Sequence, residues 1–134
     1  MPFSGPARVE FLPDGVHVRV LERIVYTDAA GRDWVVPVGF TSDGASIPQA
    51  LWSELGSPFT GQYRVAAIFH DAAYAQLGVT KDDADAMFRA CAVECGTSHL
   101  LAELIFQGVR VGGVDAYADD QCKACALPDG QPSA

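Results

Sequence analysis

Hydrophobic and polar residues alternate over the first forty positions, which is the pattern expected of β-strands with one buried face. Turn-forming residues at Pro13–Gly15 and Ala29–Arg32 separate the alternating runs. Antiparallel hairpins joined into a small meander are therefore the simplest topology. Because Pro37 has no N–H to donate, we expect the last strand to lie at an edge or to end its ladder there. The predicted strands, all within residues 7–38, are Val9–Phe11, Val16–Val20, Ile24–Tyr26 and Trp34–Val38.

After Gly39 the hydrophobic positions repeat with the period of helices. The clearest start is at Thr80, because Thr80 with Asp83 three residues later resembles a capping box. Strands followed by helices predict an α+β fold, in which an N-terminal antiparallel β-meander precedes a bundle of three to four helices. The predicted helices, within about residues 48–112, are Gln49–Leu55, Gln62–Gln76, Thr80–Glu94 and Ser98–Val111.

Length and composition fit one folded domain. The chain has 134 residues, of which 49% are hydrophobic, and this supplies one core but not two. We assign residues 1–126 to a single α+β domain and the polar residues 127–134 to a flexible C-terminal tail. No apolar stretch is long enough for a transmembrane segment. Since the N-terminus has no basic start followed by an apolar run, we expect no signal peptide.

The net charge limits the partners of the chain. Nine Lys and Arg residues against seventeen Asp and Glu residues give a net charge of −8. Such a field repels phosphate backbones unless a local basic patch reverses it, and the basic residues are scattered along the chain. Nucleic acid is therefore not expected as a partner, whereas the oligomeric state stays open.

Two titratable residues stand in a helical segment that is otherwise apolar. The segment Ala66–Tyr74 places His70 and Asp71 among small and apolar residues, so we expect both to be buried and to need partners. His70 and Tyr74 share a stripe of this helix, while Asp71 points about 100° away. The helix could thus present a base and a metal ligand side by side. Equally, His70 could be an ordinary buried histidine and Asp71 could pair with Arg64.

Asp85 lies one turn inside the next helix and borders its apolar stripe. If the two helices form a hairpin, as their short connection favours, the Asp85 carboxylate reaches the ring of His70. The alternative is a surface carboxylate paired with Lys81 four residues earlier. The spacing leaves both interpretations open.

The connection Gly39–Pro48 carries oxygen-bearing side chains. Asp43 and the hydroxyls of Ser42 and Ser46 could hold a hard cation or an oxyanion. The same residue types also suit a plain connection from sheet to helix.

Four cysteines form two close pairs, Cys91 with Cys95 and Cys122 with Cys125. The first two are one helical turn apart and suit a shared partner better than each other. Free thiols, disulfides that join the tail to the third helix, and a Zn²⁺ site are the alternatives. Zinc ranks below the other two, because the first pair is an imperfect half-motif and no histidine assists.

The order of these segments resembles the DUF1353 family of phage and prophage proteins. The resemblance covers about residues 34–113 and leaves the last two cysteines outside. It implies a phage setting, in the virion or in the host cytoplasm, with other virion proteins as expected partners. By itself it implies no activity. The matching segments are Val36–Pro48, Trp52, Ala66–Tyr74, Ala84–Phe88 and Gly108–Gly113.

A more distant resemblance bears on mechanism. The pattern H-D-x-x-Y at residues 70–74, followed by Asp85 on a later helix, is similar to the site of secreted and parvoviral phospholipases A2. That resemblance implies that His70 is a general base and that Asp85 orients it. It further implies that Tyr74 supports the pair and that Asp71 binds Ca²⁺.

The calcium-binding loop of those lipases has a partial counterpart here. Gly39–Gly44 is the nearest equivalent and lacks the Gly-x-Gly spacing. We therefore expect Asp43 to supply a carboxylate to the cation instead.

Two functions follow from these observations. One is a small metal-assisted hydrolase acting on an ester or amide of lipid or envelope material. The other is a non-catalytic virion component, of a tail or an accessory structure, in which the same side chains form a polar packing network. The sequence leaves open whether the protein is an enzyme.

Overall fold

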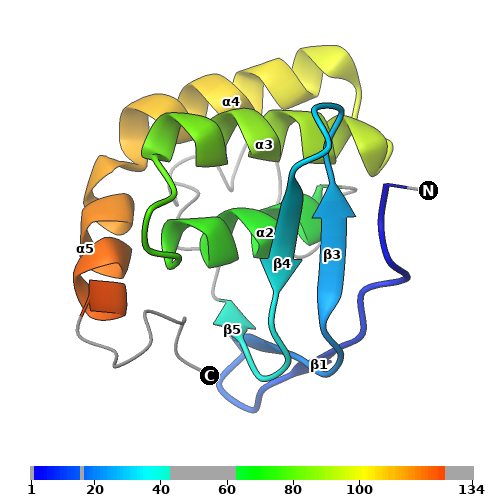
Figure 1. Ribbon diagram of the computed structural model, residues 1–134, viewed down its shortest axis with the longest axis vertical. Helices are drawn as coiled ribbons and strands as arrows, with labels where there is room; N and C mark the ends of the chain where they lie inside the picture. Colours follow the sequence, from blue (N-terminus) through cyan, green and yellow to red (C-terminus); the bar gives the residue numbers. More distant parts are fainter. Residues whose placement is uncertain (1, 16, 43–62, 126–134) are drawn as a thin grey trace.

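Five short strands precede four helices in the part of the chain that the structure describes, residues 2–15, 17–42 and 63–125 (Figure 1). This computed structural model confirms the α+β arrangement, with antiparallel strands first and helices after them. The predicted helix Gln49–Leu55 and the tail 127–134 lie outside the described residues. The strands are β1 (Val9–Phe11), β2 (Val18–Val20), β3 (Ile24–Thr27), β4 (Asp33–Val36) and β5 (Thr41–Ser42), and the helices are α2 (Arg64–Tyr74), α3 (Lys81–Glu94), α4 (His99–Gly112) and α5 (Val114–Cys125).

The strands form two small sheets rather than one continuous meander. Strands β1, β2 and β5 make an antiparallel sheet in that order, and β3 pairs with β4 in a separate hairpin. Gly39, with φ of 87°, turns the chain back along β2. Its N–H donates to Val20 O (2.8 Å), and the Val20 N–H donates to Phe40 O (2.9 Å). The free edge of β2 is therefore taken by the segment after β4, so β3 cannot pair there. Strand β4 ends at Val36, directly before Pro37, as expected.

Local capping sets the boundaries of α3. The Thr80 hydroxyl accepts from the Asp83 N–H (3.1 Å), so the predicted N-cap is confirmed. At the other end Gly96 adopts φ of 100°, and the Thr97 N–H donates to Ala92 O (3.0 Å). This pattern is a Schellman motif, which needs a residue that tolerates the left-handed region.

Helix α5 was not predicted, because Gly112–Gly113 suggested an end to helical structure and the following residues have no apolar stripe. Long-range hydrogen bonds anchor this helix instead. The Tyr117 hydroxyl donates to Val79 O (2.6 Å), and Gln121 Nε2 donates to Tyr74 O and Gln76 O (2.8 Å each). These carbonyls belong to the last residue of α2 and the turn after it, so α5 closes that end of the helical layer (Figure 1).

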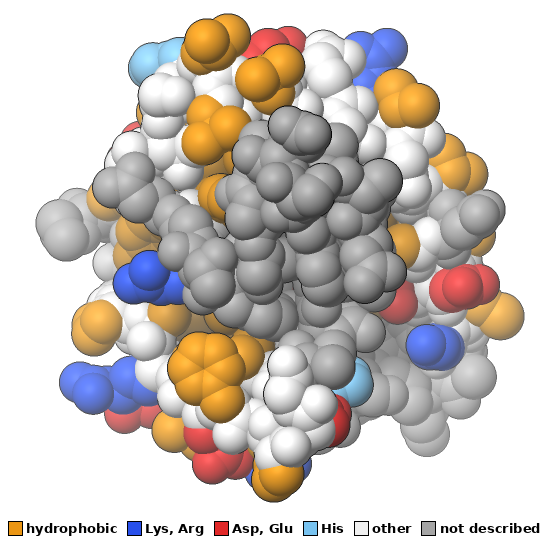
Figure 2. Space-filling model, turned by 180° about the vertical axis from the view of Figure 1, so that it is seen from behind, with side chains coloured by type: hydrophobic (Ala, Val, Ile, Leu, Met, Phe, Trp, Pro, Cys, Tyr) orange, Lys and Arg blue, Asp and Glu red, His pale blue; other side chains and the backbone are white. Residues whose placement is uncertain are grey.

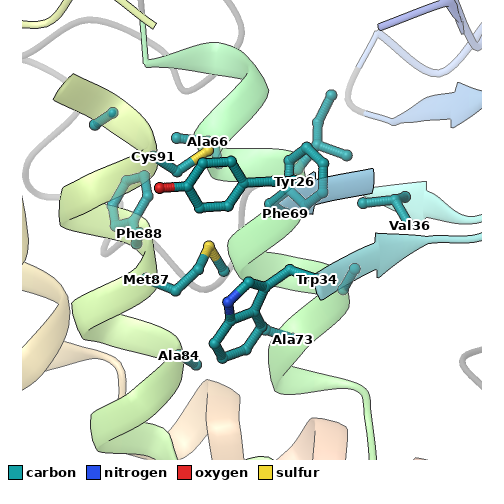
Figure 3. Close-up of a cluster of buried hydrophobic side chains, with 14 of the residues drawn as sticks. Tyr26, Trp34, Val36, Ala66, Phe69, Ala73, Ala84, Met87, Phe88 and Cys91 are labelled. Carbon is teal, nitrogen blue, oxygen red and sulfur yellow. The ribbon is translucent and has the colours of Figure 1, made fainter. Parts of the chain in front are cut away.

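The core lies between the β3–β4 hairpin and the helices α2 and α3. Figure 3 shows Tyr26 and Trp34 pointing from the hairpin toward Met87 and Phe88 of α3, with Phe69 of α2 beside them. The Tyr26 and Phe69 rings meet edge to face at 6.0 Å. Both helices also carry fully buried alanines at positions facing this core, among them Ala66, Ala67, Ala72, Ala73, Ala84 and Ala92.

Charged side chains are dispersed over the described surface. On the face shown in Figure 2, Lys and Arg side chains lie apart from one another and several lie beside acidic ones. Arg19 pairs with Glu10 (2.8 Å) and Arg8 with Glu22 (3.2 Å). Among the described helices, none has the length and apolar character needed to cross a membrane.

The N-cap of α3 gives the first prediction. Thr80→Ala removes the acceptor for the Asp83 N–H, and we expect it to lower the free energy of unfolding by about 1 kcal/mol. Thr80→Ser keeps the hydroxyl and should retain most of the stability. Urea denaturation followed by circular dichroism measures both variants. An equal loss in the two variants would show that the cap is not the cause.

Candidate active site

The Asp85 carboxylate lies where α2, α3 and α4 meet. Its Oδ1 is 2.7 Å from His70 Nε2 and accepts from the Tyr74 hydroxyl at 2.6 Å. His70 and Asp85 have no exposed surface (0% each). The expected contact between one imidazole and a carboxylate from the next helix is thus present, and it is fully enclosed.

Helical spacing explains why these side chains converge. His70 and Tyr74 are four residues apart on α2, so their polar atoms lie on one stripe of that helix. The turn after α2 contains Gly78 with φ of 86°, which returns the chain so that α3 packs beside α2. Asp85 falls one turn inside α3 and so faces that stripe. The predicted helical hairpin therefore accounts for the contact.

Aromatic rings hold the imidazole in place. The His70 ring stacks on Phe88 with centroids 4.7 Å apart and an interplanar angle of 28°. The centroid of the Tyr74 ring lies 4.2 Å from that of the His70 ring. The Tyr74 ring in turn packs edge to face on Tyr117, with centroids 5.1 Å apart. Because close-packed rings leave the imidazole little rotational freedom, its Nε2 stays directed at the carboxylate.

Lys81 also belongs to this cluster, although the sequence suggested it only as an alternative partner of Asp85. Its Nζ donates to Asp85 Oδ2 (2.6 Å) while Oδ1 contacts His70. The pairing with Lys81 is therefore confirmed together with the contact to His70, whereas the expected surface position of the carboxylate is wrong because Asp85 is buried. The same Nζ donates to Val109 O and Arg110 O (2.9 Å each), near the C-terminus of α4. The reach to α4 was missed, because the i, i+4 spacing indicates only the Asp85 contact. Lys81 thereby joins the carboxylate to the negative end of a helix dipole.

The electrostatics of the cluster favour an ionised carboxylate. Burial alone would raise the pKa of Asp85, but the hydrogen bonds that it accepts, first among them the one from His70, outweigh burial and hold this pKa below its ordinary value. Burial, together with the hydrogen bond to Asp85, raises the pKa of Tyr74, so its hydroxyl stays protonated and donates. An ionised Asp85 can only accept, and therefore His70 Nε2 carries the proton of this hydrogen bond.

Asp71 faces a different direction from His70, as its position on the helix predicts. Its Oδ2 accepts from the Ser42 hydroxyl, which ties α2 to the last residue of β5. The alternative pairing of Asp71 with Arg64 is not formed among the described contacts, and Arg64 lies instead at the wall of a surface pocket. Asp71 is almost completely buried (6% exposed).

The described residues supply only part of the ligand set that a cation would need. Residues 2–15, 17–42 and 63–125 contain no group of three or more His, Cys, Asp or Glu side chains placed to hold a metal ion. Asp71 offers one carboxylate, whereas Ca²⁺ takes about six to eight oxygen ligands. Asp43 lies outside the described residues. Asp71 and Ser42 alone therefore do not complete a calcium site.

The cysteines whose side chains are described are free thiols. Cys91 is buried, Cys95 is partly exposed and Cys122 is exposed. The side chain of Cys125 lies outside the described part of the structure. A disulfide among the three described cysteines is thus absent, while the zinc alternative with Cys125 stays a prediction.

A small cavity lies beside Asp85 between α3 and α4. It has a volume of about 240 Å³, and its described lining is Asp82, Asp85, Phe106 and Arg110. Although the cavity borders Asp85, the Asp85 side chain itself is buried (1% exposed). The cavity walls carry charges of both signs.

Comparison with known proteins places these residues in a family. The profile described as "Protein of unknown function (DUF1353)" matches residues 18–109, which include β2 through most of α4 and all the described site residues. The chain belongs to the DUF1353 family. The family region therefore contains His70, Tyr74, Lys81 and Asp85. Among the described elements, β1, the last three residues of α4 and α5 fall outside it.

One relative extends this finding. "Uncharacterized protein y4jT" of Sinorhizobium fredii (strain NBRC 101917 / NGR234) is 33% identical over 92 residues, which cover 69% of this chain. The aligned region spans only 22% of that protein, so in this relative the DUF1353 region is part of a much longer chain. No solved structure matches the sequence.

Removal of the central carboxylate should be costly. Asp85→Asn leaves Lys81 and His70 without an anionic partner, and we expect the free energy of unfolding to fall by about 3–5 kcal/mol. Asp119→Asn, at an exposed position of α5, should change it by less than about 0.5 kcal/mol. Thermal and urea unfolding of both variants test this difference. Similar stabilities would contradict a central role for the buried carboxylate.

The depressed pKa of Asp85 predicts a dependence of stability on pH. Because its folded-state pKa lies below the unfolded value of 3.8, the stabilisation from Asp85 is fully present above about pH 5 and is lost as the pH falls below 3.8 through the folded-state pKa. The stability difference between the natural chain and Asp85→Asn should therefore shrink in acid. Urea midpoints of both chains at several pH values between 2.5 and 6 measure it, and a constant difference would contradict the assignment.

Proposed function

We propose that this protein is a small hydrolase of esters or amides, with His70 as general base and with Asp85 and Tyr74 as the groups that position it. The observation that carries the proposal is the 2.7 Å contact between His70 Nε2 and Asp85 Oδ1, on an oxygen that also accepts from Tyr74. A carboxylate on one ring nitrogen fixes the tautomer and directs basicity to the other nitrogen.

The proton path follows from this tautomer. With Nε2–H committed to Asp85, Nδ1 is the nitrogen that takes the proton from an attacking water. The imidazolium that forms is stabilised by the ionised carboxylate, which stays ionised because its donors hold its pKa low. Lys81 fixes the second carboxylate oxygen, so Asp85 cannot rotate away from the ring as the charge develops.

A divalent cation such as Ca²⁺ is part of the proposal, with Asp71 and Asp43 as its carboxylate ligands. Two facts support it. Asp71 directly follows His70 in sequence, and its carboxylate is bonded to Ser42, the residue immediately before Asp43. When bound, such an ion would stabilise the negative charge that develops on the substrate oxygen. The likeness to phospholipases A2 supports an ester of lipid or envelope material as the substrate class.

Complete burial of His70 and Asp85 favours a second candidate function. A non-catalytic phage virion protein, of a tail or an accessory structure, would use the same side chains as a polar network that fixes helix packing. Since the imidazole has no exposed surface, catalysis requires the packing around the ring to open, whereas a packing role does not. The phage setting, in the virion or the host cytoplasm, and virion proteins as partners belong to this candidate.

Hydrolysis assays separate the two candidates. Turnover of fluorogenic carboxylic esters and of phospholipid vesicles is measured with calcium and with EDTA, for the natural chain and for His70→Ala. We expect His70→Ala to lower turnover by about 10²- to 10⁴-fold, the usual contribution of a general base. Loss of activity in EDTA would support the cation ligands.

His99→Ala is the matched control, because His99 is an exposed histidine at the start of α4. It should leave turnover unchanged. Unfolding is measured in parallel, so that a variant that fails to fold is not mistaken for a catalytic variant. If His70→Ala folds and hydrolyses every substrate as fast as the natural chain, the hydrolase proposal is wrong and the packing role remains.

A further inference from the structure

A pocket at the start of α2 and the end of α3 has the composition of a ligand site. It has a volume of about 620 Å³, within the usual range for small-molecule pockets of about 300–1,000 Å³. Its walls come from four separate parts of the chain: the N-terminal segment, the start of β3, the start of α2 and the end of α3. The described lining residues are mostly apolar, namely Phe3, Gly5, Pro6, Ala7, Ile24 and Val65, with Arg64 and Cys95 as the polar members.

Hydrogen bonds hold the N-terminal wall of this pocket in place. The Ser4 N–H donates to Val25 O, and the Val25 N–H donates to Ser4 Oγ (2.9 Å each). The Thr27 N–H donates to Pro2 O (2.7 Å), so the segment runs along β3. Phe3 packs on Tyr26 with ring centroids 5.1 Å apart. The wall is therefore anchored to the core, and a ligand would enter a largely preformed pocket.

Arg64 gives the pocket a positive charge. Its side chain is exposed, and no carboxylate of the described residues lies in an ion pair with it. In contrast, Arg8, Arg19, Arg32 and Arg89 each pair with an acidic side chain. On a chain of net charge −8, an exposed arginine that forms no ion pair within the described part of the chain and lies beside an apolar hollow complements an anionic head group.

Cys95, at the pocket wall, provides a thiol whose reactivity can be measured. The hydrogen bond from the buried Cys91 thiol lowers the pKa of Cys95 and outweighs the opposing effects of burial and of the Glu94 charge. The backbone of Ala66 and the charge of Arg64 lower it further. Cys91, which is fully buried, has its pKa raised by the same hydrogen bond and by burial. Of these two neighbouring thiols, only the one at the pocket wall is therefore expected to react with alkylating reagents.

We infer that the pocket formed by Phe3–Ala7, Ile24, Arg64, Val65 and Cys95 binds a small amphipathic anion, a medium-chain alkyl carboxylate. The apolar walls take the alkyl chain, and Arg64 at the edge takes the carboxylate. This site is separate from the His70–Asp85 cluster in its lining residues, so the inference does not depend on the hydrolase proposal.

Binding of octanoate, decanoate and dodecanoate below their micellar concentrations tests the inference directly. Isothermal titration calorimetry on the natural chain should show affinity rising with chain length, by up to about fourfold for each methylene buried. Dodecyltrimethylammonium and dodecanol should bind more weakly than dodecanoate. Arg64→Gln should weaken dodecanoate about two- to fivefold, while Arg23→Gln, at another exposed arginine, should not.

Thiol protection locates the ligand. In the 134-residue chain with Cys122→Ser and Cys125→Ser, dodecanoate should slow the alkylation of Cys95 by iodoacetamide, measured by mass spectrometry. Ala7→Phe fills the pocket and should abolish both binding and protection, while Ala118→Phe on the exposed face of α5 should leave both unchanged.

Failure takes three distinct forms. Absence of dodecanoate binding, or binding that leaves the Cys95 alkylation rate unchanged, would overturn the site. Equal binding of dodecanoate, dodecanol and dodecyltrimethylammonium would overturn the role of Arg64 and the anionic class of ligand.

Discussion

A single buried negative charge organises the helical half of this protein. The Asp85 carboxylate has no access to water at its surface, and burial of an unpaired charge would be prohibitive. It is sustained by a ring N–H and a hydroxyl from α2 and by an ammonium group from α3 that also caps the end of α4. Three helices thus depend on one side chain, and the relative positions of these helices follow from satisfying it.

The same arrangement serves either candidate function, because orienting an imidazole and fixing helix packing require identical contacts. What separates the two is whether the second ring nitrogen takes a proton from water, as a general base must. Membership of the DUF1353 family, whose function is unknown, does not decide between the hydrolase and the packing role. In the rhizobial relative the aligned region is 22% of the chain, so a function can also involve parts of that protein which have no counterpart in the aligned residues.

Sequence reasoning succeeded where local physics decides. The hairpins β1–β2 and β3–β4, the N-cap Thr80, and the meeting of His70 with Asp85 all follow from turn residues, capping and helical spacing. Sequence reasoning failed where the structure depends on contacts between segments far apart in the chain, at a strand edge or at the carbonyls that end a helix. Pairing of β5 with β2 depends on the turn at Gly39, and α5 is held by Tyr117 and Gln121 through carbonyls some forty residues away in the chain. The contact of Ser42 with Asp71 is of the same long-range kind, and no periodicity in the sequence indicates it.

The buried alanines of α2 and α3 have a consequence for sequence variation. The separation of two packed helices is set by the side chains between them, and alanine permits a close approach. A short carboxylate such as Asp85 meets the ring of His70 only while that separation is kept. Positions such as Ala66, Ala73 and Ala84, which carry no reactive group, are therefore under as much constraint as the polar residues themselves, and any bulkier residue there would act on the site from a distance as a spacer.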